Sequence, residues 1–240
     1  MTTIDTSTQI DDTKIAHRRE IKSFVRREGR ATPAQERAIN ELLPVYGIDY
    51  CDTQQLNFFN LFGNHNSVWF EIGFGMGHSL ASMAETMPHI NFLGIEVHRP
   101  GVGSLLNIVQ EKGLTNIRVI SHDAVEVLKN MIIPHSLARV LLFFPDPWHK
   151  TRHHKRRIVQ PNFMSLVASR LTSDGAFHAA TDWEPYAQWM LEIMEAHPEY
   201  INADAANMFA TKPDYRPETK FERRGQRLGH GVWDLVYLKR

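Results

Sequence analysis

The chain has 240 residues, of which 42% are hydrophobic and 22% charged, so it can bury a sizeable core and is not a largely disordered chain. Its 27 basic and 27 acidic residues cancel, and this balance favours no partner, although a neutral total can contain local basic patches. A single cysteine, Cys51, excludes an intrachain disulfide. No apolar run reaches the roughly 18 residues that span a bilayer, and residues 1–12 lack the apolar core of a signal peptide. We therefore expect a cytoplasmic protein with no membrane partner.

The first 30 residues predict a flexible basic arm. Residues 1–13 are polar, and residues 14–30 contain seven Lys or Arg residues against two acids. Residues 31–240 are expected to form one domain, and its first part, residues 33–62, is predicted to be partly helical.

From residue 67 onward, strands and helices are predicted to alternate. Strands are expected at 68–72, 92–96, 117–121, 139–144 and 175–181, with a final antiparallel strand at 232–238. Helices are expected at 78–87, 100–112, 124–131, 160–171 and 185–196. This alternation favours an α/β, Rossmann-like fold with a mostly parallel, doubly wound sheet. Ligands of such sheets bind beyond the carboxyl ends of the strands, and each polar motif below falls at such an end.

A glycine-rich turn follows the first predicted strand, in the string Glu71-Ile-Gly-Phe-Gly-Met-Gly77. Glycines at Gly73, Gly75 and Gly77 would let the backbone approach a ligand without a Cβ clash. The spacing G-x-G-x-G differs from the dinucleotide fingerprint G-x-G-x-x-G and favours a nucleoside bound without a diphosphate. A plain tight turn is the alternative.

Carboxylates end the next two predicted strands. Glu96 can accept hydrogen bonds from ribose hydroxyls, or it can cap the helix that follows. Asp123, next to Ala124, can accept from an adenine amino group, and it can also be the N-cap of the next helix. With the glycine turn, these residues predict a nucleoside pocket that suits S-adenosylmethionine better than NAD.

The fourth predicted strand ends in Phe143-Phe-Pro-Asp-Pro-Trp148. Two prolines stiffen the turn that carries Asp146, which can accept hydrogen bonds from a base, while Trp148 can stack on it. The alternative is a structural turn with a buried Trp.

A basic segment follows directly, and no acid occurs between Pro147 and Ser173. Such a run suits the phosphates of a nucleic acid, although a solvated basic loop is the alternative. The histidines in this run lack a convincing carboxylate or thiolate complement, so no metal site is predicted. The candidate nucleic-acid contacts are Lys150, Arg152, His153, His154, Lys155, Arg156 and Arg157.

These motifs together resemble the bacterial tRNA (guanine-N7)-methyltransferase family. The resemblance covers about residues 18–238 and is carried by residues 23–27, 29–30, 71–77, 92–98, 100–103, 122–128, 143–150, 155–160, 180–186, 219–222 and 225–234.

The resemblance implies a class I methyltransferase that transfers a methyl group from S-adenosylmethionine to N7 of guanine 46 in the variable loop of tRNA. We also expect no metal and no obligate protein partner, and a protein that is a monomer or homodimer. The resemblance places the cofactor on Glu71, Glu96, Asp123 and Asp146. It places tRNA on Lys150, residues 152–157, Asp182, Thr219, Lys220, Phe221 and Glu222, and Arg26 and Arg27 of the arm are further candidates.

Guanine N7 has a free lone pair and no proton, so an in-line transfer needs no general base. Asp146 is the candidate catalytic residue, and Asp182 or Glu222 could also stabilise the cationic purine. The alternatives are a methyltransferase for another RNA base or for protein, a tRNA-binding protein without catalysis, and a nucleotide-dependent dehydrogenase. Intact Glu96, Asp123 and Asp146 disfavour the tRNA-binding protein without catalysis, and the glycine spacing disfavours the dehydrogenase.

Overall fold

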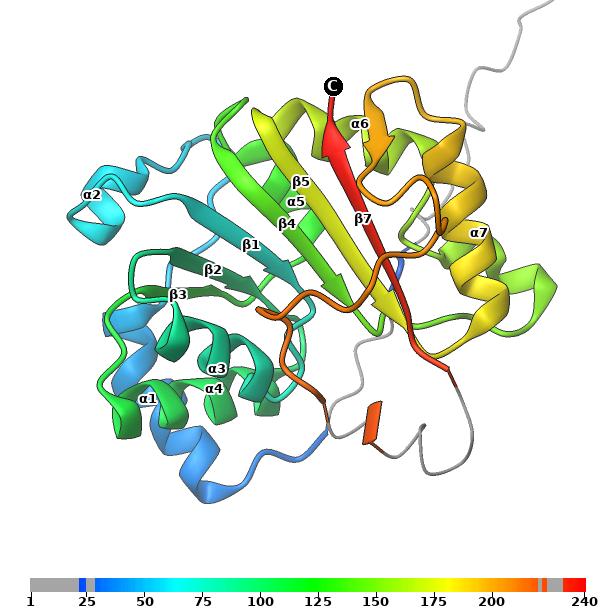
Figure 1. The fold of residues 1–240 in the computed structure, drawn as a ribbon. Helices are drawn as coiled ribbons and strands as arrows, with labels where there is room; N and C mark the ends of the chain where they lie inside the picture. Colours follow the sequence, from blue (N-terminus) through cyan, green and yellow to red (C-terminus); the bar gives the residue numbers. More distant parts are fainter. Residues whose placement is uncertain (1–21, 25–28, 220–221, 224–230) are drawn as a thin grey trace, which may run out of the picture.

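A seven-stranded sheet forms the centre of the computed structural model, which describes residues 22–24, 29–219, 222–223 and 231–240. The strand order is β3-β2-β1-β4-β5-β7-β6 (Figure 1). The parallel strands are β1 (Val68–Ile72), β2 (Asn91–Ile95), β3 (Ile117–Ile120), β4 (Leu137–Phe143) and β5 (Leu171–Thr181). The strand β7 (Trp233–Lys239) runs antiparallel to β5, and β6 (Tyr200–Asn202) runs antiparallel to β7. The predicted mostly parallel α/β fold with an antiparallel C-terminal strand is confirmed.

Helices cover both faces of this sheet. One face is covered by α1 (Pro33–Tyr46), α3 (His78–Thr86) and α4 (Arg99–Lys112), and the other by α5 (Ala124–Asn130), α6 (Pro161–Arg170) and α7 (Glu184–Glu195) (Figure 1). Because both faces are covered, every residue of β1 and β2 is buried, as expected for central parallel strands. Two short helices complete the chain, α2 (Phe58–Phe62) and the 3₁₀ helix η1 (Thr151–Arg156).

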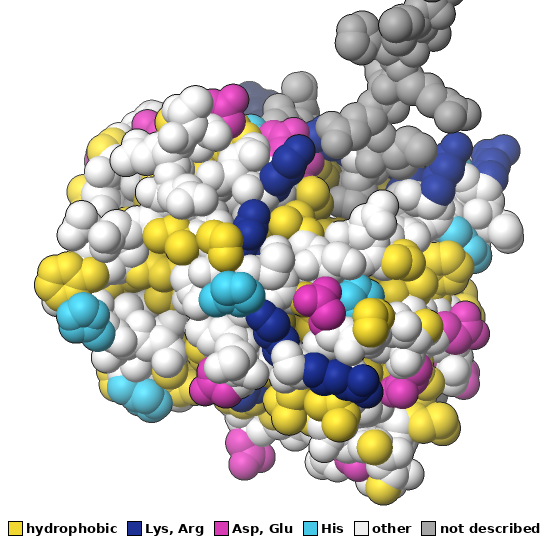
Figure 2. Space-filling model, turned by 90° about the horizontal axis from the view of Figure 1, so that it is seen from above, with side chains coloured by type: hydrophobic (Ala, Val, Ile, Leu, Met, Phe, Trp, Pro, Cys, Tyr) yellow, Lys and Arg dark blue, Asp and Glu magenta, His cyan; other side chains and the backbone are white. Residues whose placement is uncertain are grey.

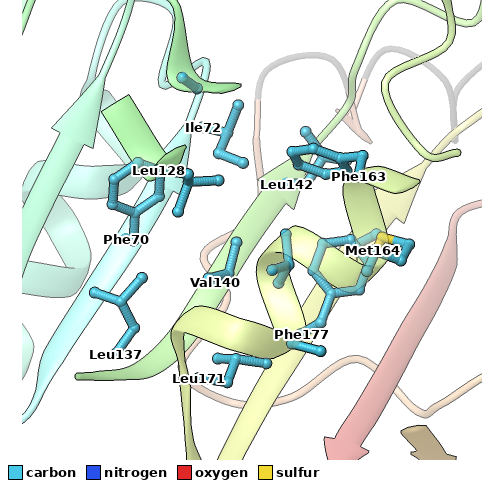
Figure 3. Packing of buried hydrophobic residues seen from close by; sticks show 14 of the residues in the cluster. Phe70, Ile72, Leu128, Leu137, Val140, Leu142, Phe163, Met164, Leu171 and Phe177 are labelled. Carbon is cyan, nitrogen blue, oxygen red and sulfur yellow. The ribbon is translucent and has the colours of Figure 1, made fainter. Parts of the chain in front are cut away.

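The larger core cluster lies between the sheet and α5 and α6. Figure 3 shows Phe70 of β1, Val140 of β4 and Phe177 of β5 against helix residues that include Leu128 and Met164. All five side chains are fully buried. This packing holds the carboxyl ends of neighbouring strands at one edge, which positions the polar strand-end residues.

Local sequence signals explain several element boundaries. Helix α1 begins at a capping box in which Thr32 accepts from the Gln35 amide and the Gln35 side chain accepts from the Thr32 amide. Helix α4 ends at Gly113, whose φ of +64° is favourable for glycine, as predicted.

Besides shifts of one or two residues at other element ends, three features differ from the sequence prediction. Helix α6 ends at Arg170 and β5 begins at Leu171, because Leu171 pairs with Leu137 before a register shift in the β4–β5 ladder. The strand β6 was not predicted, since three residues held by pairing with β7 give no periodic signal. The 3₁₀ helix was expected as loop. Among the described helices, none combines the length and apolar character needed to cross a membrane.

Candidate active site

A cleft of about 270 Å³ opens at the carboxyl ends of β1 to β4. Its walls include five residues that the sequence placed at a cofactor: Gly73, Glu96, Asp123, Ala124 and Asp146. The structure therefore brings together, from four strand ends, most of the expected cofactor residues.

The three glycines of the turn have different surroundings. All have positive φ, +70° at Gly73, +59° at Gly75 and +79° at Gly77, a region that side chains rarely adopt. A Cβ added at Gly73 or Gly75 would meet nothing within 4 Å, whereas at Gly77 it would lie 2.5 Å from Cβ of Leu105. The first two glycines thus leave open space, while the third allows α3 and α4 to pack closely.

Glu96 fastens the glycine turn to the next strand. Its Oε2 accepts a hydrogen bond from the Gly75 amide at 2.8 Å, and its Oε1 accepts from the amides of Val97 at 2.7 Å and His98 at 2.8 Å. His98 is the N-cap of α4, and the amides that Glu96 binds all lie before the first residue of that helix, so the helix-capping alternative is not borne out. The carboxylate also lines the cleft.

Glu71 is a buried carboxyl next to this arrangement, and it is not among the residues that line the cleft. Its Oε2 has no hydrogen-bond partner among the described residues. Burial, together with the negative charge of Glu96, raises the pKa of Glu71 to about 8. Glu71 is therefore mostly protonated at neutral pH, and it is a polar group without a partner beside the glycine turn.

Asp123 caps α5, since its Oδ1 accepts from the Val125 amide at 3.0 Å. Its Oδ2 lies 2.9 Å from Nζ of Lys22, which also contacts Glu126 at 2.7 Å. The hydrogen bonds to Glu126 and Asp123 raise the pKa of Lys22, and the bond from Lys22 lowers the pKa of Glu126.

Two residues of the N-terminal arm line the cleft, and Lys22 lies next to them in the chain. Ser23 and Phe24 line the cleft, the Ser23 carbonyl accepts from Trp148 Nε1 at 3.1 Å, and the Lys22 carbonyl accepts from Arg156 Nε at 3.2 Å. Sequence reasoning missed these residues as part of the cofactor cleft, because the contacts join segments more than 100 residues apart. The other arm candidates, Arg26 and Arg27, lie outside the described residues, as do Lys220 and Phe221.

The turn after β4 carries an exposed carboxylate on a constrained backbone. Phe144 and Trp148 have φ of +51° and +47°, uncommon for bulky residues, and Asp146 stands between them. The Phe144 amide donates to the Ala180 carbonyl at 2.7 Å, which ties the turn to β5. The Trp148 ring is covered by the Arg156 guanidinium at 4.4 Å.

The basic segment divides into surface and buried parts. Lys150, Arg152 and Lys155 are exposed, and His153, His154 and Arg156 are partly exposed. Arg157 is only 3% exposed, since its Nε donates to the Pro147 carbonyl and its guanidinium lies over the rings of Tyr186 and Trp189. In this conformation Arg157 stabilises the fold, which differs from the phosphate contact expected for it.

Two further carboxylates have different surroundings. Asp182 is partly exposed at the end of β5, beside Trp183, which begins α7. Glu222 is 2% exposed, and Arg216 binds both of its oxygens, so the structure does not bring Glu222 to the cleft as expected. Thr219 is partly exposed, and its Oγ1 accepts a hydrogen bond from the Glu222 amide at 3.0 Å.

The face at the amino ends of the parallel strands, opposite the cleft, carries side chains of several chemical types. Figure 2 shows hydrophobic, acidic and histidine side chains interspersed with a broken row of Lys and Arg on that face. Across the described part of the chain, no three His, Cys, Asp or Glu side chains converge as metal ligands would.

Comparison with known proteins defines the class. A family model described as "Putative methyltransferase" matches residues 65–235. The 16S rRNA methyltransferase KamB has a similar fold, with a TM-score of 0.55 at 14% identity over 76% of this chain and 92% of that one. The aminoglycoside resistance methyltransferase NpmB1 gives a TM-score of 0.51 at 14% identity over 78% of this chain and 95% of that one. The fold is that of a class I S-adenosylmethionine-dependent methyltransferase.

Sequence relatives narrow the class to a family. The tRNA (guanine-N(7)-)-methyltransferase of Aeromonas hydrophila subsp. hydrophila is 58% identical over 221 residues, which are 92% of this chain and 93% of that protein. Proteins of the same name from Pseudomonas syringae pv. syringae and Shewanella woodyi are 56% and 54% identical, over 93% and 91% of this chain and 91% and 92% of their own lengths. The chain belongs to the tRNA (guanine-N7)-methyltransferase family.

Proposed function

We propose that this protein transfers a methyl group from S-adenosylmethionine to N7 of guanine 46 in the variable loop of tRNA. One observation carries the proposal: Gly73, Glu96, Asp123 and Asp146 line a single cleft, and the exposed cations of the basic segment begin four residues after Asp146. The names of the relatives support guanine N7 as the acceptor atom. Position 46 comes from the motif resemblance.

The cleft residues fit S-adenosylmethionine. The open space beside Gly73 and Gly75 suits a ligand that approaches the backbone, and the unpartnered carboxyl of Glu71 indicates a missing polar contact nearby. Glu96 would hold the ribose hydroxyls. Asp123 would accept from the adenine amino group, sharing the oxygen that Lys22 now contacts.

When bound, S-adenosylmethionine would supply an electrophilic methyl group for direct transfer to the lone pair of guanine N7. Since that atom carries no proton, the protein's task is to orient the base and to stabilise positive charge on it. Good orientation can contribute about 7–11 kcal/mol to such a step. Asp146 would do both, by accepting from the base N–H groups and by facing the cationic purine with a carboxylate. Its constrained turn limits the side chain to few orientations.

The RNA backbone would be held by Lys150, Arg152 and Lys155, which are exposed on one short segment. Phosphate binding by such cations releases counterions, so affinity should fall as salt rises. Arg157 is left out of this group because it is buried against Tyr186 and Trp189.

Methyl transfer to unmodified tRNA transcripts tests the proposal. Two transcripts are compared, one with guanine at variable-loop position 46 and one with adenine. The proposal expects 7-methylguanine in the first alone. Equal transfer to both would reject the position, and transfer to neither, with binding of S-adenosylhomocysteine intact, would indicate another substrate.

A further inference from the structure

A network of buried charged side chains joins Arg216 to Asp234 of β7 and to Glu222. Arg216 is 1% exposed, and its guanidinium makes four charged hydrogen bonds. Two go to Asp234 of β7, at 2.7 and 2.9 Å, and two go to Glu222, at 2.7 and 3.1 Å. Arg216 is therefore a bidentate bridge between two buried carboxylates, an arrangement with little freedom of orientation.

The network continues into the parallel strands. The other contact of Asp234 is His178 Nε2, at 2.7 Å, and His178 Nδ1 lies 2.8 Å from the hydroxyl of Tyr215. Arg139 of β4 donates to that hydroxyl at 2.7 Å. Burial alone would raise the pKa of Asp234, but the hydrogen bonds from His178 and Arg216 outweigh it and lower the pKa. The bridge is thus anchored on β4, β5 and β7, which the segment crosses in Figure 1, where it is drawn in orange.

On its other side, the Arg216 bridge reaches Thr219 through Glu222, and it reaches the cleft wall at Phe144. The Glu222 amide donates to Thr219 Oγ1 at 3.0 Å, and the Thr219 amide donates to Oε2 of the Glu222 side chain at 3.4 Å, so the carboxylate that Arg216 holds also contacts Thr219. The Arg216 guanidinium also lies 5.8 Å from the centre of the Phe144 ring. Phe144 lines the cleft, has a positive φ, and comes two residues before Asp146.

This geometry leaves Glu222 little capacity to read a base. Arg216 contacts both carboxylate oxygens, Lys212 lies 3.8 Å from one of them, and the side chain is almost fully buried. By contrast, Thr219 is partly exposed, and Asp146 is exposed at the cleft.

We propose that Arg216 is a positioning residue for the RNA side of the active site. It holds Thr219 through Glu222, and it holds the turn that carries Asp146 by packing against Phe144. Glu222 then acts by fixing Thr219, and the edge of the guanine is read by other groups. This inference rests on the proposed function, because it assigns Thr219 and the turn to the same RNA substrate.

Steady-state kinetics with two tRNA transcripts test the inference. One transcript carries guanine at position 46, and the other carries inosine, which retains N7 and N1–H and lacks the 2-amino group. The variants are Arg216→Met, Arg216→Lys and Glu222→Gln, and the matched control is Lys112→Gln, which breaks the exposed pair with Glu85 on distant helices. Binding of S-adenosylhomocysteine and thermal unfolding are measured for each.

We expect kcat/KM for tRNA to fall at least about tenfold in Arg216→Met and Glu222→Gln, with S-adenosylhomocysteine affinity within about twofold of the parent protein. Arg216→Lys should recover part of the loss, and Lys112→Gln should lose nothing. If Glu222 fixes Thr219, the Glu222→Gln substitution lowers kcat/KM by the same factor on both transcripts. If Glu222 reads the 2-amino group, the substitution lowers kcat/KM clearly less on the inosine transcript, and that result would overturn the inference.

Two other outcomes also contradict the inference. One is unchanged kcat/KM per folded molecule in Arg216→Met and Glu222→Gln, with only a lower unfolding temperature, since that result means a purely structural role. Should Arg216→Met not fold, Glu222→Gln decides, because it retains the shape of the side chain. A parent protein that methylates neither transcript rejects the proposed function itself, and with it the inference.

Discussion

Replacing Gly77 by alanine should destabilise the fold, whereas replacing Gly73 should mainly weaken cofactor binding. Both glycines have positive φ, so either substitution costs about 1–2 kcal/mol of backbone strain. At Gly77 the new Cβ would also lie 2.5 Å from Cβ of Leu105, an atom that cannot swing away. Such overpacking adds about 1–3 kcal/mol, which gives a total of about 2–5 kcal/mol.

At Gly73 the new Cβ meets nothing within 4 Å, so the free energy of unfolding should fall by the backbone strain alone. Because Gly73 lines the cleft, the added methyl group takes space that a ligand would use. We expect S-adenosylhomocysteine to bind about tenfold more weakly, equivalent to about 1.4 kcal/mol.

Thermal unfolding and isothermal titration separate the two effects. In a chain of this size each kcal/mol should shift the Tm by about 2–4 °C, so Gly77→Ala should lose clearly more than Gly73→Ala. The reasoning is refuted if Gly73→Ala is the less stable variant and binds S-adenosylhomocysteine normally.

Three other predictions concern single side chains. Glu71 has a pKa raised to about 8 in the fold, so its contribution to stability is present at acidic pH and is lost as the pH rises toward 8. The Tm of Glu71→Gln should therefore rise relative to that of the parent protein between pH 5 and pH 8. A Tm difference between the two proteins that stays constant over this pH range would contradict the prediction. Lys155→Ala should leave the Tm unchanged and should reduce the slope of log tRNA affinity against log salt concentration by about one. Arg157→Ala should instead lower the Tm, because its side chain is buried. If Arg157→Ala keeps the parent Tm and changes only the salt dependence of tRNA binding, Arg157 contacts phosphate. Asp146→Ala should lower kcat about 100-fold with little change in tRNA affinity, and unchanged turnover would remove Asp146 from the mechanism.

The sheet was largely predictable because its central strands are buried on both faces and end in glycine, proline or a carboxylate. These features mark β1 to β5 by residue type alone. The strand β6 was not predictable, because Tyr200–Asn202 is held by pairing with β7 and not by any pattern of its own.

The site was predictable where chemistry coincides with a strand end, as it does at Glu96, Asp123 and Asp146. Prediction failed where the surroundings come from distant segments. Arg157 belongs to a basic run by sequence, but Tyr186 and Trp189 of α7 bury it.

Motif residues on the C-terminal side show the same limit. Glu222 was expected to contact tRNA because its motif resembles that of the family. Its contact with Arg216, six residues earlier, decides that it is buried, and residue type gives no sign of this bidentate pair.

The most direct test of the central claim replaces one atom of the substrate. A tRNA transcript with 7-deazaguanine at position 46 has C–H where guanine has N7, and it keeps the base edge and the phosphates. We predict that it binds the protein as tightly as the guanine transcript and receives no methyl group. Methyl transfer to the 7-deazaguanine residue itself would contradict N7 as the acceptor.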